Sequence, residues 1–142
     1  MPVEWVIDAS LIAAVLFDET HSEVARGFLA EGVENAATMI APDLLVLELA
    51  SIAAKKVWLE AASVADGAAA IDATLRLVER PVGAANLAQR AFTLASAHRF
   101  SAYDATYLAL AEMRGCRMAT LDSRLIRRAE QEGYGHLLHP VA

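Results

Sequence analysis

Four acidic residues of this chain have apolar or small neighbours, where an ordinary fold places few charges: Asp8, Glu48, Asp104 and Asp122. Asp8, for example, ends the apolar run Trp5-Val6-Ile7. An unpaired charge in such surroundings costs several kcal/mol unless a cation or hydrogen bonds compensate it. We therefore interpret the four acids as a carboxylate cluster that binds a divalent metal ion. Oxygen ligands without nearby His or Cys favour magnesium or manganese over zinc, and such a metal suits phosphoryl chemistry.

Helix capping is the alternative explanation for three of these acids. Asp8 and Asp122 each precede an expected helix and could cap it. Ser101 and Asp104 have the Ser-x-x-Asp spacing of a capping box. Taken alone, Asp8 and Asp104 fit a cap better than a metal ligand, so only the set of four favours a metal site.

Glu48 has no such explanation, because the middle of an apolar helix offers no free backbone donors. Its structural alternative is a buried ion pair with an arginine such as Arg90 or Arg99, an arrangement that is uncommon in proteins. Asp72 serves as a control. It lies at the polar end of an expected helix, and we expect it at the surface.

The apolar pattern places the four acids on alternating strands and helices. Strands are expected at residues 4–8, 36–41, 75–78 and 117–121, with a possible edge strand at 137–139. Helices are expected at residues 10–17, 21–31, 42–58, 63–74, 84–98, 101–115 and 123–132. This alternation predicts a parallel α/β sheet, in which ligands gather at the carboxyl ends of the strands. Asp8 and Asp122 are expected at those ends.

Length and composition indicate one domain, residues 1–142, because a chain of this length with 56% hydrophobic residues can build a full core. The longest apolar stretches fall short of the ~20 residues that a membrane span needs. The N-terminus also lacks the basic region of a signal peptide, so we expect a cytoplasmic protein. The single cysteine, Cys116, has no Cys or His at zinc-ligand spacing, and core packing is its expected role.

The net charge of −6 argues against a protein that holds nucleic acid by bulk electrostatics alone. A local basic face is still possible, because five arginines lie close together near the C-terminal end: Arg114, Arg117, Arg124, Arg127 and Arg128. A solvated helix face is the alternative explanation of this charge run.

Four segments carry the acids: Val6-Ile7-Asp8-Ala9-Ser10, the helix from Pro42 to Lys56 with Glu48, the stretch from Ser101 to Ala111 with Asp104, and the stretch from Ala119 to Leu125 with Asp122. In this order and spacing they resemble the acidic motifs of PIN-domain ribonucleases, in particular the VapC toxins of bacterial type II toxin-antitoxin systems. The resemblance covers essentially the whole chain. It implies a PIN-like three-layer α/β/α fold with a central parallel sheet of four or five short strands.

The resemblance also implies an activity, a cofactor and partners. The protein would be a magnesium- or manganese-dependent endoribonuclease, the toxin of a toxin-antitoxin pair, dimeric and neutralised by a cognate VapB antitoxin. By position, the resemblance identifies the catalytic acids as Asp8, Glu48, Asp104 and Asp122, with Ser10 as the small hydroxyl residue near the first acid. Asp8 and Asp104 are the expected direct metal ligands, and Glu48 and Asp122 are expected to bind a second metal or to orient water. The RNA product should carry a 5′ phosphate.

Basic residues near these motifs are candidates for contacts with the RNA backbone, because phosphate contacts position a nucleic acid without reading its sequence. These candidates are Lys55, Lys56, Arg124 and Arg127. Three rival functions remain: a non-catalytic PIN-like binding module, a nuclease that acts on DNA, and a receiver or phosphatase domain. The last of these needs neighbouring acids after the first strand, which Asp8-Ala9-Ser10 does not supply.

A homodimer is also expected. The hydrophobic content of 56% and the mean hydropathy of +0.36 exceed what one small domain usually needs to bury. The helices expected at residues 21–31 and 42–58 are the proposed interface, with Phe28, Val57 or Trp58 exposed.

Overall fold

The computed structural model describes residues 3–78 and 80–141. Its three strands are β1 (Glu4–Ile7), β2 (Thr38–Ile40) and β3 (Arg117–Ala119). Its α-helices are α1 (Ala9–Leu16), α2 (Ser22–Glu34), α3 (Leu44–Trp58), α4 (Val64–Leu77), α5 (Ala88–His98), α6 (Ala102–Arg114) and α7 (Ser123–Gln131). Short 3-10 turns lie at η1 (Ala84–Asn86) and η2 (Gly135–Leu137).

The three strands form a parallel sheet in the order β2-β1-β3. In the register of this sheet, Val6 of the central strand lies opposite Ile40 on one side and Met118 on the other. Trp5, Val6 and Ile7 are all buried, which is typical of a strand that is covered on both faces. The chain therefore places β2 on one side of β1 and β3 on the other. This change of direction creates a topological switch point at the carboxyl end of β1.

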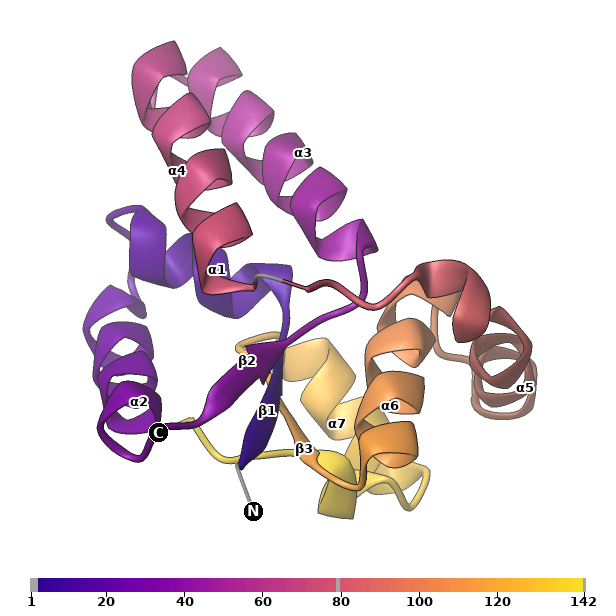
Figure 1. The fold of residues 1–142 in the computed structure, drawn as a ribbon. Helices are drawn as coiled ribbons and strands as arrows, with labels where there is room; N and C mark the ends of the chain where they lie inside the picture. Colours follow the sequence, from indigo (N-terminus) through magenta and orange to yellow (C-terminus); the bar gives the residue numbers. More distant parts are fainter. Residues whose placement is uncertain (1–2, 79, 142) are drawn as a thin grey trace.

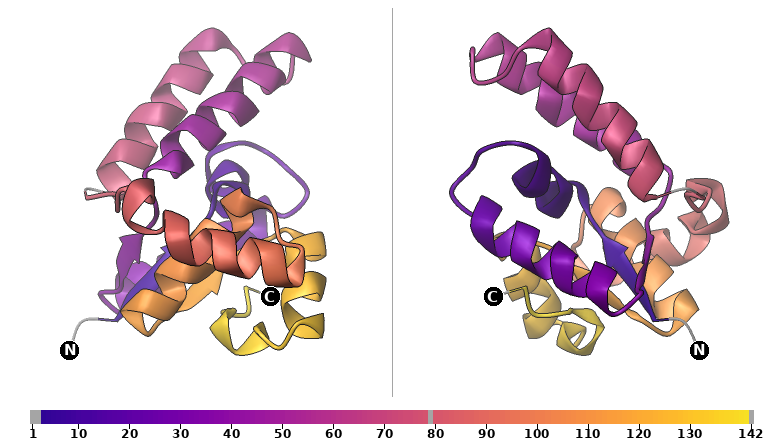
Figure 2. Two further views of the ribbon diagram at one scale, coloured as in Figure 1. Left: turned by 90° about the vertical axis from the view of Figure 1, so that its right-hand side faces the viewer. Right: turned by 60° about the vertical axis from the view of Figure 1, so that its left-hand side comes forward.

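Helices cover both sides of the sheet. Helices α5 and α6 lie on one side and α2 lies on the other, as the views from the two sides show (Figures 1 and 2). Helices α3 and α4 pack against each other and project beyond the sheet (Figure 1). Small residues allow this close packing: a Cβ atom placed on Gly67 would lie only 3.6 Å from the Cβ of Ala53. The predicted α/β architecture with a central parallel sheet is thus confirmed.

Residues 75–78 are not the strand that the sequence predicts, because α4 continues to Leu77. Ala70, Thr74 and Val78 are buried at intervals of one helical turn, and the hydroxyl of Thr74 bonds the carbonyl oxygen of Ala70 at 2.8 Å. Leu75 points outward and is 49% exposed. The apolar residues before Pro81 therefore continue the helical spacing of α4.

The expected edge strand at residues 137–139 is reduced to a single parallel bridge between Leu138 and Met118. The backbone N–H of His139 donates to the carbonyl oxygen of Met118 at 2.7 Å, so this segment extends the sheet beside β3. Phe28 was expected at an exposed interface, and this expectation is wrong. It is only 4% exposed, because its ring packs on Trp5 with 4.5 Å between ring centres.

Two smaller expectations can be checked directly. Asp72 is exposed, as predicted, and Cys116 is half-buried rather than fully within the core. Among the described residues, no helix has the length and apolar character required to cross a bilayer.

Candidate active site

The carboxyl edge of the sheet receives all four predicted acids. Asp8 directly follows β1, and Asp122 follows the neighbouring strand β3. Helix α6 runs back along the sheet before β3, so its first turn, which contains Asp104, lies at the same edge. Helix α3 leaves this edge after β2 and carries Glu48 near its start. The topology therefore explains why acids from four distant segments meet.

Asp8 is buried, with 7% of its surface exposed, and both of its carboxylate oxygens accept hydrogen bonds. Oδ1 accepts from the Ser10 hydroxyl at 2.7 Å and from the Leu11 backbone N–H at 3.1 Å. Oδ2 accepts from the Thr120 hydroxyl at 2.5 Å. Asp8 is thus the N-cap of α1, as the capping alternative predicts, but the cap occupies Oδ1 alone.

The two hydroxyls that bind Asp8 also join the ends of β1 and β3. Ser10 Oγ accepts from the backbone N–H of Leu121 at 3.0 Å, and Thr120 Oγ1 accepts from that of Asp122 at 3.0 Å. Each hydroxyl therefore orients the Asp8 carboxylate and also fixes the backbone that follows β3. Sequence reasoning identified Ser10 but missed Thr120. The available signal was a hydroxyl residue two positions before Asp122, which mirrors Ser10 two positions after Asp8.

Glu48 is half-buried, and its Oε1 accepts a hydrogen bond from the Tyr107 hydroxyl at 2.7 Å. The alternative of a buried ion pair is wrong: Arg90 pairs with Glu112 instead, and Glu48 forms no ion pair with Arg99. Tyr107 was not assigned a role from the sequence. Its signal was its position one turn after Asp104 on the same helix.

Asp104 differs from the acid of a complete capping box. In α4, Ser63 bonds the backbone N–H of Asp66, and the Asp66 carboxylate bonds the backbone N–H of Ser63 in return. In α6, Ser101 bonds the backbone N–H of Asp104 at 3.0 Å, but the carboxylate makes no return bond to the Ser101 backbone. The Asp104 carboxylate is therefore available to other groups at the sheet edge.

Asp122 is the N-cap of α7. Its Oδ1 accepts from the backbone N–H groups of Arg124 at 3.0 Å and Leu125 at 3.2 Å. The capping alternative is correct here too. Because these bonds use only Oδ1, the second oxygen of the carboxylate remains for another contact.

Burial and mutual repulsion raise the pKa of three of the acids. Burial raises the pKa of Asp8 to about 6, against hydrogen bonds that lower it, and the charge of Asp122 adds to the rise. Burial also raises the pKa of Glu48, and the charges of Asp8 and Asp104 contribute. The pKa of Asp104 rises through burial and the charge of Asp122. Each carboxylate therefore interacts with at least one other, so the four act as one electrostatic group.

No positive side chain neutralises this group. None of the four acids forms an ion pair with a described Lys, Arg or His side chain. Across residues 3–78 and 80–141, no three His, Cys, Asp or Glu side chains are close enough together to hold a metal ion. The donors at this edge are carboxylate and hydroxyl oxygens, however, and these fit a hard cation such as Mg²⁺ or Mn²⁺.

The predicted RNA contacts fall in different places. Arg124 lines a pocket together with Asp104, and Arg127 is exposed on the same helix, α7. Lys55 is exposed on α3, about 10 Å along the helix axis from Glu48. Lys56 is already engaged, because its Nζ lies 2.6 Å from Glu19.

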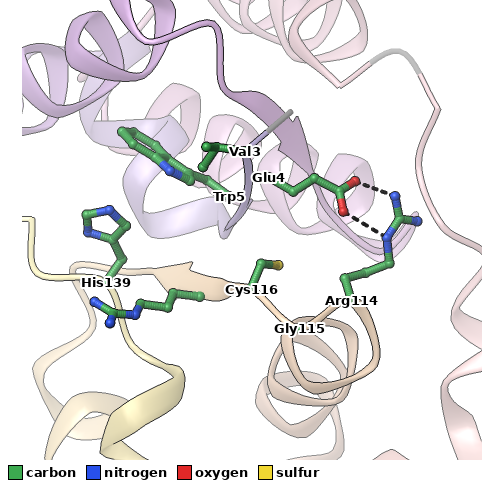
Figure 3. A pocket seen from close by; sticks show the side chains of 8 residues that line it. Val3, Glu4, Trp5, Arg114, Gly115, Cys116 and His139 are labelled. Carbon is green, nitrogen blue, oxygen red and sulfur yellow. Dashed lines mark hydrogen bonds and ion pairs between the residues drawn. The ribbon is translucent and has the colours of Figure 1, made fainter. Parts of the chain in front are cut away.

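A second pocket lies at the opposite, amino end of the strands (Figure 3). There the guanidinium of Arg114 makes an ion pair with Glu4 of β1, beside the half-buried Cys116. An acid at this end of β1 is therefore neutralised within the protein, in contrast to the acids at the carboxyl end.

Comparisons with known proteins agree with this arrangement. One solved structure, PAE2754 from Pyrobaculum aerophilum, has 20% sequence identity and a TM-score of 0.67, over 90% of this chain and 87% of that chain. Another, VapC20 from Mycobacterium tuberculosis, is a toxin that cleaves the sarcin-ricin loop. It has 18% identity and a TM-score of 0.71, over 87% of this chain and 93% of that chain. These similarities support the fold. No curated protein matches significantly.

The family model of the PIN domain matches residues 5–131, and this stretch includes all four acidic positions. The match spans most of the chain and agrees with the resemblance that the acidic motifs suggest. The chain therefore belongs to the PIN domain family.

Proposed function

We propose that this protein is a metal-dependent endoribonuclease that hydrolyses RNA phosphodiester bonds and acts as the VapC-type toxin of a toxin-antitoxin pair. The observation that carries the proposal is the group of four carboxylates at the switch point, whose charges repel one another and which have no cationic partner among residues 3–78 and 80–141. Elsewhere the protein pairs an acid with a cation, as it does for the partly exposed Glu4. An unpaired group at a ligand-binding edge is better explained by an external cation.

Asp8 and Asp104 are the residues that we assign to direct binding of Mg²⁺ or Mn²⁺, with Glu48 and Asp122 beside them. When bound, the cation would supply Lewis-acid chemistry that activates water and stabilises charge on the scissile phosphate. The protein contributes orientation: the hydroxyls of Ser10 and Thr120 hold the Asp8 carboxylate.

Tyr107 has the corresponding role for Glu48. Burial and the negative charge of Glu48 raise the pKa of Tyr107 well above its ordinary value, so its hydroxyl keeps its proton and continues to donate. Glu48 can then accept a proton from water, or hold that water, through the oxygen that Tyr107 does not occupy.

The proposed partners follow from the same function. The substrate is RNA, and the structural neighbour VapC20 cleaves an RNA site, the sarcin-ricin loop. A cognate VapB-type antitoxin would block the site with a segment that carries a cation, because four acids attract positive charge. With an RNA substrate and a VapB-type antitoxin, we expect the protein to act in the cytoplasm.

A purified-enzyme assay tests the activity. We expect cleavage of RNA with added Mg²⁺ or Mn²⁺, loss of cleavage with EDTA, and a 5′ phosphate on the product. Asp104→Asn should be inactive, whereas Asp72→Asn, an exposed acid outside the site, should remain active. RNA binding without cleavage under all metal conditions would favour a non-catalytic binding module. Equal cleavage of DNA would contradict the RNA assignment.

We also propose a homodimer. Because Phe28 is buried, we assign the interface to α3 and α4. Ala53, Val57 and Trp58 of α3 line an apolar groove with Gly67 of α4, and Trp58 is 77% exposed. Light scattering at micromolar concentration should give twice the chain mass of 15.2 kDa. Trp58→Glu should shift the protein toward the monomer. A monomer at every concentration would refute the dimer.

A further inference from the structure

An arginine-lined pocket adjoins the acid group. Arg99, at the C-terminal end of α5, and Arg124 and Arg128, on α7, line this pocket together with Asp104. Arg124 and Arg128 lie one helical turn apart, so their side chains project from the same face of α7. Two segments that are distant in sequence, the end of α5 and helix α7, thus bring three guanidinium groups to the edge of the proposed catalytic site.

None of these three arginines forms an ion pair with a described residue. Elsewhere, Arg90 pairs with Glu112 and Arg114 pairs with Glu4. The pocket contains an acid, Asp104, yet no arginine makes an ion pair with it. The protein carries a net charge of −6, so an unpaired cluster of arginines is not a consequence of excess positive charge.

We propose that Arg99, Arg124 and Arg128 form a binding site for a backbone phosphate of a single-stranded nucleic acid. This phosphate would be adjacent along the strand to the scissile phosphate, which would lie at the four acids. This inference rests on the proposed nuclease function and deepens it. Guanidinium groups present several N–H donors in a geometry that matches phosphate oxygens. A strand whose scissile phosphate reaches Asp104 must continue past it, and this pocket offers donors for the next anionic group.

A phosphate explains the position of the pocket better than a carboxylate of a protein partner. Either anion adds a negative charge beside the four acids, but a partner's carboxylate has no chemical need to lie next to a hydrolytic site. A nucleic acid strand instead presents phosphates at regular intervals, so its recognition requires an anion site close to the hydrolytic site. In its simplest form, the pocket positions the strand and contributes no sequence preference.

The test measures binding, so it does not depend on turnover. Asp8→Asn serves as the parent, because it should not cleave the probe, a short single-stranded RNA of mixed sequence. In this background, Arg128→Gln should weaken RNA binding about fivefold to tenfold at low salt. It should also reduce the slope of log affinity against log salt by about 0.7. Arg76→Gln is the matched control, since Arg76 is exposed on α4 outside the pocket, and it should change affinity about twofold or less.

A second variant separates binding from folding. Arg99 has a left-handed backbone, with φ of 58°, at a helix end where Gly115 occupies the equivalent position of α6. Arg99→Gly should raise the melting temperature, because glycine adopts this conformation without strain, and should still weaken RNA binding about fivefold. Arg99→Lys, which keeps the charge, should retain most of the affinity.

The remaining outcomes are separable. If Arg128→Gln and Arg76→Gln weaken binding equally while the wild type cleaves RNA, the pocket inference fails and the proposed function stands. If the parent binds a DNA strand but no RNA, the RNA assignment fails, and loss of DNA binding in Arg128→Gln would still support the phosphate site. If the variants lose affinity for a polyglutamate peptide but not for RNA, the pocket binds a protein partner and the inference is overturned.

Discussion

The two ends of β1 carry acids in opposite situations. At the amino end, Glu4 forms an ion pair with Arg114, so its charge is neutralised within the protein. At the carboxyl end, Asp8 is buried and receives only neutral donors, two hydroxyls and one backbone N–H. Both ends satisfy their hydrogen bonds, but only one compensates its charge. The comparison separates an acid whose charge is paired within the protein from one that we propose binds an external cation.

The same contrast applies to energetics. A partly exposed ion pair such as Glu4–Arg114 contributes roughly 1 kcal/mol or less to stability. A buried acid with a raised pKa destabilises the folded protein at neutral pH, because the folded state binds the proton more tightly than the unfolded state. The carboxyl end of β1 therefore lowers stability, which is expected where function determines the residue types.

Asp8→Asn should have the largest effect: it should lower RNA cleavage and raise the stability of the folded protein. Cleavage should fall by about three orders of magnitude or more, because the amide cannot bind a cation as the carboxylate does. Without metal at pH 7, the variant should be more stable by about 1 to 2 kcal/mol: removal of a buried charge outweighs one lost hydrogen bond, and Asn remains a good N-cap. Chemical denaturation measures the gain.

The pH dependence of this gain provides the control. The pKa of Asp8 is raised to about 6 in the folded protein from an ordinary value of 3.8. The contribution of Asp8 to wild-type stability should therefore be most favourable below about pH 4 and should be lost as the pH rises through 6. Asp8→Asn should lack this loss, so the two proteins should approach each other in acid. An equal difference at pH 4 and pH 7 would contradict the assignment of a buried, charged Asp8.

Thr120→Val should have the next largest effect, because it removes the hydroxyl that donates to Asp8 Oδ2. Loss of such an orienting group costs about tenfold to hundredfold in activity. The Thr120 bond lowers the pKa of Asp8, so without it this pKa rises further and the acid limb of the rate profile should move to higher pH. Thr120→Ser keeps the hydroxyl and should restore both properties. A valine variant with an unchanged profile would show that the hydroxyl only supports packing.

Tyr107→Phe tests the corresponding contact at Glu48, with a smaller expected effect. It removes one donor without changing the ring, so we expect kcat to fall about tenfold with KM nearly unchanged. Tyr103→Phe is the matched control, because Tyr103 lies on the same helix and is 67% exposed. Equal activity of the two variants would remove Tyr107 from the site.

The sequence predicted the acids of the site and Ser10, but not Thr120 and Tyr107, the other side chains that donate to these acids. Asp8 and Glu48 could be identified because a charge within an apolar run is visible in a single segment. Thr120 and Tyr107 could not, because each contacts an acid that is distant along the chain, by 112 positions for Thr120 and Asp8 and by 59 for Tyr107 and Glu48. Such contacts depend on the order of the strands, which local periodicity does not determine.

The fold shows the same limit. Alternating strands and helices were predictable, because burial imposes a regular spacing on each element. The strand at residues 75–78 was predicted wrongly because a short apolar run before a proline fits both a strand and a helix end. Phe28 was placed outside because its partner Trp5 lies on β1, and only the packing of α2 against the sheet reveals this contact.

The smallest expected effect is at the amino end of β1, and it completes the comparison. Glu4→Gln removes one charge of the Glu4–Arg114 pair, whose side chains are 21% and 41% exposed. Because solvent screens this pair, unfolding free energy should change by less than about 1 kcal/mol and activity should be unaffected. A double-mutant cycle with Arg114→Gln should give a coupling of similar size that disappears at high salt. A large loss of cleavage in Glu4→Gln would mean that the two ends of β1 are functionally linked, and the distinction between structural and catalytic acids would then fail.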